Sequence, residues 1–511
     1  MGRALRHVVD GAILVEWPGA AGREANAAAV AIAQALAAEP PRGLYDAIPG
    51  ARTLLVLFAP ELLTHRAAEE LLARIEPRPG EAQARTVKIA TVYGGASGPD
   101  LDTLARRAGA GVDELVRAHA AAEHRVAFLG FAPGFAYLIG APRALAVPRL
   151  ATPRVRVPAG SVAVADGYSG IYPAQVPGGW HLIGRTATRL FDASRKPPAL
   201  LSPGDRVVFE PVTDLDFSSM DSTGENILHV AHPVLRVISP GAFTSVQGGP
   251  GYGLGSSGVP RGGAMDLARL AAANSAVGNP PLAPGLEITV SGPEVELLAD
   301  AELAVGGDID CSPADPWPRA ARAGDRVKFG PVRHGVRAYV AIRGGLSPAG
   351  AEATTRRLRA GDLLGRAGTA PLRARIPEQG DRDMRNPIEV RAIPGPHLEW
   401  FSSAGIDTFF SSEYTASTRS DRRGLRLDGP RIELSRAADL PPEGVTPGAV
   451  QVPGDGLPIA LGPDGPVTGG YPRVATVIGA DLGLLAQVRP GQKIRFVLTT
   501  LAEALAVWRR S

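Results

Sequence analysis

The chain has 511 residues, with 54 basic and 51 acidic side chains and a formal net charge of +3. This near balance predicts no partnership with nucleic acid or with an anionic membrane surface. Four of the basic residues are lysines, and none follows a glycine or lies in the small-residue context of a biotin-carrier hairpin. A Walker A loop and a self-carried biotin are therefore excluded. The single cysteine excludes intramolecular disulfides and multi-cysteine metal centres.

The length predicts three or four domains. No apolar run reaches the roughly 18 residues of a membrane-spanning helix, and the first residues lack the pattern of a secretory signal. A cytoplasmic protein is expected.

The first 85 residues predict a small α+β unit. An alanine-rich helix is expected over 26–38 and a second helix over 60–75, where Pro60 lies near the first turn. The apolar run 53–58 between them predicts a buried strand.

Two further helices are expected over 101–108 and 112–122, each with an aspartate near its start. After residue 125, glycines and prolines are spread between short Val/Ile-rich runs, which is typical of short strands and tight turns. The chain is therefore expected to be mainly β.

One phrase occurs three times: a small residue, a glycine and a polar residue lead into an alternating strand. The copies lie at 203–209, 323–329 and 490–496. The first copy follows a Val-Pro pair at 157–158 and a Tyr-Pro motif at 170–173. The third copy follows a similar Val-Pro pair at 452–453 and a similar Tyr-Pro motif at 469–472. We interpret the repeats as a duplicated β module used about three times.

The polar segment 214–232 is predicted to be a linker between two halves of the chain. The predicted domains are 1–85 (α+β), 86–213 (a β-barrel), 233–390 (the first β-barrel domain of the second half) and 391–511 (a second barrel).

Several residues stand out as candidate site residues. Phe131, Phe135 and Tyr137 lie on a Pro-Gly turn, and they either cap a barrel or form the apolar wall of a ligand site. His119 is a candidate acid or base, because its spacing of five from His124 is poor for a shared metal.

The match to G-x-G-x-x-G at 253–258 is followed by Val-Pro and not by a helix, so it predicts a loop near a site and not a dinucleotide fingerprint. Asp266 precedes a predicted helix, where capping is the simplest role. Glu287 and Arg422 are charges of the kind that bind polar substrates.

An ordered series of motifs runs through nearly the whole chain. In the first half the motifs lie at 93–101, 119, 130–138, 153–154, 157–162, 170–173 and 177–186. In the second half they lie at 244–247, 258–260, 263–266, 274, 278–279, 287, 291–293, 420–424, 451–453, 455–456, 468–472 and 485–487. The series resembles the families of the B-type and C-type subunits of 5-oxoprolinase, also called KipI and KipA or allophanate hydrolase subunits 1 and 2. It is similar too to the carboxyltransferase region of urea carboxylase and urea amidolyase.

This resemblance implies an α+β N-terminal domain followed by repeated cyclophilin-like β-barrels. It implies the fused B–C component of an ATP-dependent 5-oxoprolinase, which opens a lactam to glutamate together with a separate A-type subunit. The expected cofactor is ATP with Mg, no protein-bound metal site is expected, and an oligomeric assembly is expected.

We expect a composite site at the junction of the two halves, with the aromatic residues as its wall and Gln247, Asp266 and Gln451 as polar groups. The predicted catalytic residues are His119, Asp266 and Glu287, the two acids acting as metal or proton partners. Arg154, Arg185 and Arg422, together with backbone amides, are predicted to hold the triphosphate. The predicted substrate-binding residues are Phe131, Phe135, Tyr137, Arg154, Arg185, Gln247, Arg422, Gln451 and Tyr471.

Two alternatives remain open at this stage. The chain could be a carboxyltransferase acting on urea or another amide, with biotin carried by a partner biotin carboxylase or carrier. It could also be a non-catalytic, KipI-like regulator of a histidine kinase. Three loops that are expected to face the site depart from the family pattern, at 248–250, 350–355 and 466–470.

Overall fold

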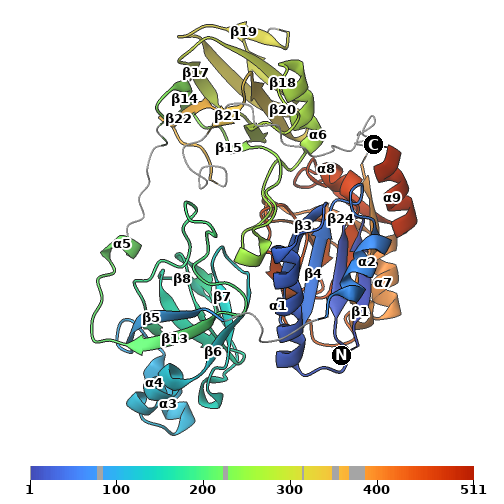
Figure 1. Ribbon diagram of the computed structural model, residues 1–511. Helices are drawn as coiled ribbons and strands as arrows, with labels where there is room; N and C mark the ends of the chain where they lie inside the picture. Colours follow the sequence, from blue (N-terminus) through green and yellow to red (C-terminus); the bar gives the residue numbers. More distant parts are fainter. Residues whose placement is uncertain are drawn as a thin grey trace.

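The computed structural model describes residues 2–76, 84–221, 228, 230–313, 316–347, 356–367 and 386–510. The described residues form four units: an N-terminal α+β unit, a closed barrel, a nine-stranded sheet and a second closed barrel (Figure 1). The departing loop 350–355 lies outside the described residues. The mainly β architecture agrees with the sequence prediction.

The N-terminal unit is a four-stranded antiparallel sheet covered on one face by two helices. In sheet order the strands are β1 (Ala4–Val9), β2 (Ala12–Glu16), β4 (Thr53–Phe58) and β3 (Leu44–Pro49). Helices α1 (Gly22–Ala38) and α2 (His65–Arg74) pack on the face that carries Ile13 and Val56. Helix α2 begins five residues later than predicted, because Thr64 caps it by accepting a hydrogen bond from the Ala67 amide.

The first barrel closes through seven strands. In ring order these are β5 (Thr86–Tyr93), β12 (His181–Arg185), β9 (Ser161–Ala165), β10 (Tyr168–Ile171), β7 (Ala136–Ile139), β6 (His124–Leu129) and β13 (Arg206–Pro211). Helices α3 (Leu101–Ala108) and α4 (Val112–Ala121) connect β5 to β6, close to their predicted bounds. Strands β8 (Arg154–Val157) and β11 (Val176–Gly178) pair as a separate ribbon.

The middle unit is a nine-stranded sheet, and the pairing of its described strands does not close into a ring. Its strands are β14 (Pro233–Ser239), β15 (Phe243–Gln247), β16 (Gly285–Thr289), β17 (Glu294–Leu297), β18 (Ala301–Ser312), β19 (Arg319–Ala321), β20 (Arg326–Ile342), β21 (Leu346–Ser347) and β22 (Leu363–Arg366). Helix α6 (Leu267–Ala276) packs against β18 and β20. The second copy of the repeated phrase therefore leads into β20, a strand of an open sheet.

The second barrel also closes through seven strands. In ring order these are β23 (Ile388–Pro394), β30 (Arg473–Val477), β27 (Ala449–Gln451), β28 (Ile459–Leu461), β25 (Gly424–Asp428), β24 (Glu413–Ala416) and β31 (Lys493–Leu498). Strands β26 (Glu443–Gly444) and β29 (Thr468–Gly469) form a separate ribbon. Helices α7 (Ser403–Ser411), α8 (Leu482–Leu485) and α9 (Leu501–Arg510) complete the unit. The predicted boundary between 390 and 391 divides β23, which belongs to this barrel.

The two barrels have the same strand order, and each includes one parallel pair, β5 with β13 and β23 with β31. The prediction of a duplicated module is confirmed for these two copies. The Tyr-Pro phrases, however, are not equivalent: 170–173 ends β10, whereas 469–472 leads into β30 and corresponds to 177–180 before β12. Short Gly-aromatic-Pro motifs favour tight turns, and they therefore recur at the ends of different strands.

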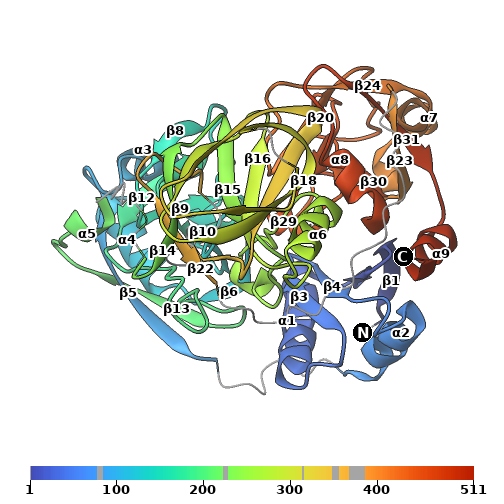
Figure 2. The same cartoon turned by 90° about the horizontal axis from the view of Figure 1, so that it is seen from above.

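The N-terminal unit packs on the second barrel, although the two lie at opposite ends of the chain. The second face of its sheet, including Leu14 and Leu55, shares an apolar core with Ile393 and Ile478. Helix α9 lies beside β1 (Figure 2), and Trp508 donates a hydrogen bond to Glu61 at 3.1 Å. The predicted linker includes the short helix α5 (Ser218–Asp221). No helix in the described part of the chain is long and apolar enough to cross a membrane.

Candidate functional site at the junction of the units

The β6–β7 turn, which holds the predicted aromatic residues, lies against the second half of the chain. The Gly134 amide donates a hydrogen bond to the Ser257 carbonyl at 3.0 Å, on the 3-10 turn η2 (Gly255–Ser257). Gly258 has a φ of +77°, and a methyl group there would come within 2.9 Å of the Ala132 carbonyl oxygen. Glycine is therefore required at 258 by both conformation and space.

The same turn touches the β26–β29 ribbon of the second barrel. A methyl group on Gly130 would overlap the Thr468 side chain. The N-terminal unit reaches this point as well, because the Ala51 amide donates to the Pro442 carbonyl at 2.7 Å. Asn26 ties the N-terminal unit to the first barrel by donating to the carbonyls of Gly50 and Ala127. We call this meeting point of the N-terminal unit and the two barrels the junction.

The predicted aromatic wall is largely a buried cluster at the end of the first barrel. Phe135 is 1 % exposed and packs edge-on against Trp180, and Tyr137 also contacts Trp180. Burial raises the pKa of the Tyr137 hydroxyl, so it stays neutral. Phe131, held at φ +66°, is only partly buried. Of the three aromatic residues, Phe131 is therefore the one best placed to touch a ligand.

Asp266 and Glu287 belong to one buried network between the nine-stranded sheet and the second barrel. Glu287 accepts hydrogen bonds from the Met265 amide at 2.8 Å and the Tyr339 hydroxyl at 2.7 Å, and it pairs with Arg422. Burial alone would raise the pKa of Glu287, but Arg422 and Arg337 lower it below its ordinary value. The carboxylate is therefore ionised and already neutralised by the protein.

Asp266 caps α6 as expected, accepting from the Arg269 amide at 3.2 Å. Its second oxygen accepts from Gln487 Nε2 at 2.8 Å, and Gln487 Oε1 in turn accepts from the backbone amides of Val336 and Arg337. Arg422 uses its remaining donors on Asp464 and on the Gly263 carbonyl. These contacts hold the two units of the second half in one orientation.

His119 lies apart from this network, inside the first barrel. It is 0 % exposed, and its ring nitrogens are hydrogen-bonded to Tyr93 at 2.8 Å and Ser169 at 3.0 Å. Burial, together with His124, lowers its pKa well below the ordinary value. A neutral histidine with both nitrogens engaged is a core residue in this geometry.

The remaining predicted residues are spread over several elements. Arg154 pairs with Asp100 at 2.7 Å, and Arg185 donates to the Ala159 carbonyl and lies over the Phe217 ring. Asp100 is thus occupied by Arg154 and the Leu182 amide and does not cap α3 with its side chain. The other predicted positions are buried Gln247 at the end of β15, buried Gln451 at the end of β27, and Tyr471, which is 46 % exposed.

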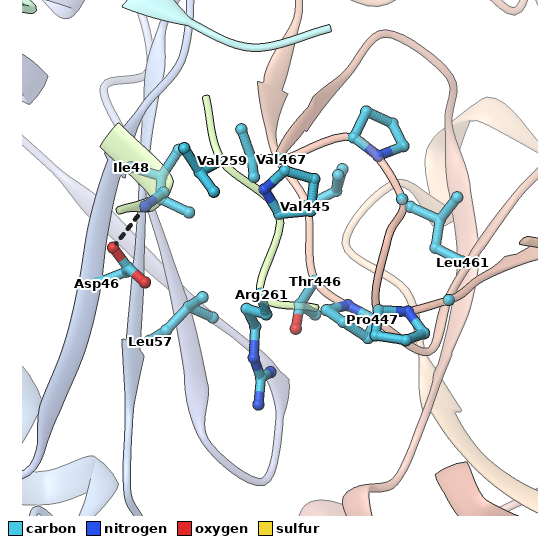
Figure 3. Close-up of a pocket in the computed structure, with 16 residues that line it drawn as sticks. Asp46, Ile48, Leu57, Val259, Arg261, Val445, Thr446, Pro447, Leu461 and Val467 are labelled. Carbon is cyan, nitrogen blue, oxygen red and sulfur yellow. Dashed lines mark hydrogen bonds between the residues drawn. The ribbon is translucent and has the colours of Figure 1, made fainter. Parts of the chain in front are cut away.

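A small cleft lies between the N-terminal unit, the arm 248–263 and the second barrel (Figure 3). Asp46 accepts hydrogen bonds from the Gly253 and Gly255 amides at 3.0 and 2.9 Å. Tyr252 on the arm stacks on Tyr45, and the Arg261 guanidinium lies over the Tyr252 ring. Sequence reasoning missed Asp46, although the glycine-rich loop signalled free amides that need an acceptor.

Sequence reasoning also missed a buried polar cluster at the end of the second barrel. Arg473 is 0 % exposed and pairs with Glu443, which also contacts His397 at 3.0 Å. Gln451 lies opposite Arg473 in the β27–β30 pairing. Within the described ranges, no three His, Cys, Asp or Glu side chains converge as a metal site requires.

Comparison with known proteins matches both halves to one family. Residues 4–201 match the model described as carboxyltransferase domain, subdomain C and D, and residues 257–498 match subdomain A and B. The chain is 36 % identical over 297 residues to the C-type subunit of 5-oxoprolinase from Escherichia coli K12, covering 53 % of this chain and 93 % of that protein. It is 45 % identical over 168 residues to the B-type subunit of 5-oxoprolinase from Escherichia coli O157:H7, covering 32 % and 77 %.

Two further relatives extend the comparison. Urea amidolyase of Lachancea kluyveri is 31 % identical over 350 residues, which are 57 % of this chain and 19 % of that protein. The protein TTHA0988, whose crystal structure is known, is 32 % identical in sequence to this chain. The two structures superpose with a TM-score of 0.83 over 97 % of this chain and 100 % of TTHA0988. The chain therefore belongs to the carboxyltransferase-domain family that includes the B-type and C-type subunits of 5-oxoprolinase, and it carries both halves in one polypeptide.

Proposed function

We propose that this chain is the fused B–C component of an ATP-dependent enzyme of the 5-oxoprolinase type, acting with a separate A-type subunit. The observation that carries the proposal is the presence of both subunit-like halves in one chain, each matched over most of its relative's length. The close packing of the halves at the junction supports a shared site. ATP consumption fits the cytoplasmic location expected from the sequence.

The chemistry explains the need for ATP. An unstrained lactam is a poor electrophile, and transfer of the γ-phosphoryl group to its carbonyl oxygen produces a better one and releases ADP. Water then adds to the carbon, the C–N bond breaks and the nitrogen takes up a proton. Hydrolysis of the resulting acyl phosphate by a second water leaves glutamate and phosphate. Mg²⁺ would enter with the ATP phosphates.

The structure supports some of the predicted contacts more than others. Arg154 and Arg185 remain the predicted phosphate contacts in the first half. The Arg422 guanidinium is held by Glu287, Asp464 and a backbone carbonyl, which supports a role in positioning the units of the second half. For His119, the two ring hydrogen bonds support a structural role.

A coupled assay tests the proposal. The purified chain, mixed with an A-type subunit, ATP, Mg²⁺ and 5-oxoproline, should release glutamate and ADP in equal amounts. Neither protein alone should do so, and omission of ATP should stop glutamate release. ADP formation without glutamate, or no turnover with any A-type partner, would contradict the proposal.

A chain cut in the linker 214–232 tests whether the halves share a site. The N-terminal unit covers apolar surface on the second barrel, so each half alone exposes that surface. We expect the halves to be inactive alone and to regain activity when they are produced together and co-purify. Full activity of either half with the A-type partner would contradict a shared site.

The match to the carboxyltransferase-domain models and to urea amidolyase favours one second candidate, carboxyl transfer from a biotin carried by a partner. That reaction requires bicarbonate, a biotin carboxylase and a biotin carrier. Labelled bicarbonate incorporated into an amide product, only when those partners are present, would support it. Glutamate release that is independent of bicarbonate and biotin would favour the 5-oxoprolinase reaction.

A further inference from the structure

The two barrels differ sharply at one equivalent pair of strand positions. In the first barrel Ala163 lies opposite Leu182 on β9 and β12, and both belong to the apolar cluster around Trp180. In the second barrel the corresponding strands β27 and β30 place Gln451 opposite Arg473. The first barrel closes the same ring with apolar residues at these two positions. The fold itself therefore does not require polar residues there.

The charge of Arg473 is compensated inside the protein by one acid. Its Nη2 donates to Glu443, and its backbone amide donates to His397 Nδ1 at 3.2 Å. The other ring nitrogen of His397 lies 3.0 Å from the same Glu443 oxygen. Burial would raise the pKa of Glu443, but Arg473 and His397 bring it below its ordinary value, so this acid is ionised.

Much of the hydrogen-bonding capacity of this cluster is unused. Arg473 Nε and Nη1, Gln451 Nε2 and Thr468 Oγ1 are buried and meet no hydrogen-bond partner among the described residues. Leaving a buried donor without an acceptor is energetically costly, and more so when the donor is charged. Arg473 and Gln451 lie opposite each other in the β27–β30 pairing, so their unmatched donors indicate that an acceptor with more than one oxygen belongs beside them. A carboxylate matches a guanidinium edge in this way.

The cluster adjoins the junction. Thr468 lies against Gly130 of the first barrel, and Gly50 of the N-terminal unit lies against the Glu443 backbone, where a methyl group would come within 2.7 Å of Glu443 Cα. Gln451 Nε2 lies 2.5 Å from the position that a Cβ on Gly469 would occupy. Glycines at 130, 50 and 469 thus allow three segments to close around the polar cluster.

We propose that Arg473, Gln451 and Thr468 bind the carboxylate of a small-molecule ligand at the junction end of the second barrel. The identity of the ligand as 5-oxoproline rests on the proposed function, whereas the carboxylate site rests on the geometry alone. Glu443 is a positioning residue that holds the Arg473 guanidinium, and His397 in turn contacts Glu443 and the Arg473 backbone amide.

The experiment compares two ligands of nearly the same ring, 5-oxoproline and 2-pyrrolidinone, which lacks the carboxylate. Binding to the full chain, alone and with the A-type partner, is measured by calorimetry and by the shift in melting temperature. We expect 5-oxoproline to bind and to raise the melting temperature, and 2-pyrrolidinone to bind at least tenfold more weakly. Equal binding of the two compounds, or no binding of either with or without the partner, would overturn the proposal.

Three variants sharpen the test. Gln451→Leu and Thr468→Val keep side-chain volume and remove a donor, so each should weaken 5-oxoproline binding about tenfold with little change in melting temperature. Arg473→Lys should also weaken it, but this change disturbs the Glu443 pair and is therefore secondary. Arg391→Gln is the matched control, because Arg391 forms a two-pronged pair with Asp481 elsewhere in the same barrel. Wild-type affinity in both Gln451→Leu and Thr468→Val would overturn the proposal.

The site and the proposed function can fail separately. If the coupled assay releases glutamate and Gln451→Leu leaves KM for 5-oxoproline unchanged, the carboxylate site is wrong and the function stands. If the chain binds 5-oxoproline or another small carboxylate through Gln451 but no partner supports glutamate release, the site stands and the function is wrong.

Discussion

The first and second barrels share one ring of strands and differ in what closes the ring at the junction. Phe209 lies beside Ile89 in the first barrel, and Phe496 lies beside Val390 in the second, at matching positions of the parallel pair. The interior apolar pattern thus preserves the topology in both copies. At the junction end one copy carries packed aromatic rings and the other a buried ion pair. The residues at the junction ends of the two barrels could diverge, because the interior apolar residues alone are sufficient to close each ring of strands.

The largest expected effect on the free energy of unfolding comes from replacing a buried charge of the second barrel by an apolar residue of the kind that the first barrel carries there. Arg473→Leu leaves Glu443 buried with only His397 beside it, and loss of one partner of a buried pair costs about 3–5 kcal/mol. The double change Arg473→Leu with Glu443→Leu should recover most of that loss, because apolar residues replace both charges. Urea unfolding of the two variants measures the difference, and an equally unstable double variant would contradict it.

The reciprocal change provides the control for that comparison. Leu182→Arg introduces a guanidinium among the aromatic rings of the first barrel, where Leu182 is 4 % exposed. With no acid placed to receive it, we expect a loss of several kcal/mol. A mild effect would show that the two barrel ends tolerate charge equally and that their difference is incidental.

The contact between the barrels is tested at Gly130. Gly130→Ala places a methyl group on the Thr468 side chain and should cost about 1–3 kcal/mol through overpacking, together with most of the coupled activity. Thr468→Gly in the same chain should restore part of the stability. Gly454→Ala is the control, since no atom lies within 4 Å of the added methyl group there. Equal melting temperatures for Gly130→Ala and Gly454→Ala would contradict the contact.

The sequence predicted well what depends on local pattern. The strand 53–58 and the helix 101–108 have the predicted bounds, and Asp266 caps α6. The sequence did not reveal that the described strands of the middle unit do not pair into a ring, because the turn motif before β20 marks where a strand begins and not which strands it pairs with. The same limit applies to the Tyr-Pro phrases, which mark turns at different points of the two rings.

The candidate site was predicted in part. The meeting of the aromatic turn with the second half was expected; Thr468 contacts this turn at Gly130, and Gln451 lies against the neighbouring Gly469. Arg473, Glu443 and His397 were missed, because they come from distant segments and form no motif along the chain. Pairing of β27 with β30 brings Arg473 opposite Gln451, and only the folded ring shows this. Burial of an arginine without matching acceptors likewise has no signature in sequence.

The dependence of folding stability on acidic pH should also distinguish the junction end of the second barrel from that of the first. Glu443 has a lowered pKa in the folded state, through Arg473 and His397 despite burial. Its stabilising contribution is therefore present above the unfolded value of about 4.3 and is lost as pH falls through the lower folded value. Glu443→Gln should remove this component and flatten the acid side of the stability profile measured by urea unfolding. An unchanged acid slope in Glu443→Gln would contradict it.

The smallest expected effect on stability, and the most informative about function, comes from Asp266. Loss of its helix cap in Asp266→Ala should cost about 1 kcal/mol, and its second oxygen also holds Gln487 between the sheet and the second barrel. If Asp266 takes part in the reaction or orients the units around the site, coupled activity should fall well beyond what a loss of about 1 kcal/mol in folding stability explains. Asp266→Asn, which keeps an oxygen for the cap, separates the two roles: retained stability with low activity indicates a functional carboxylate. Full activity in Asp266→Ala, with only the stability loss, would leave Asp266 as a helix cap.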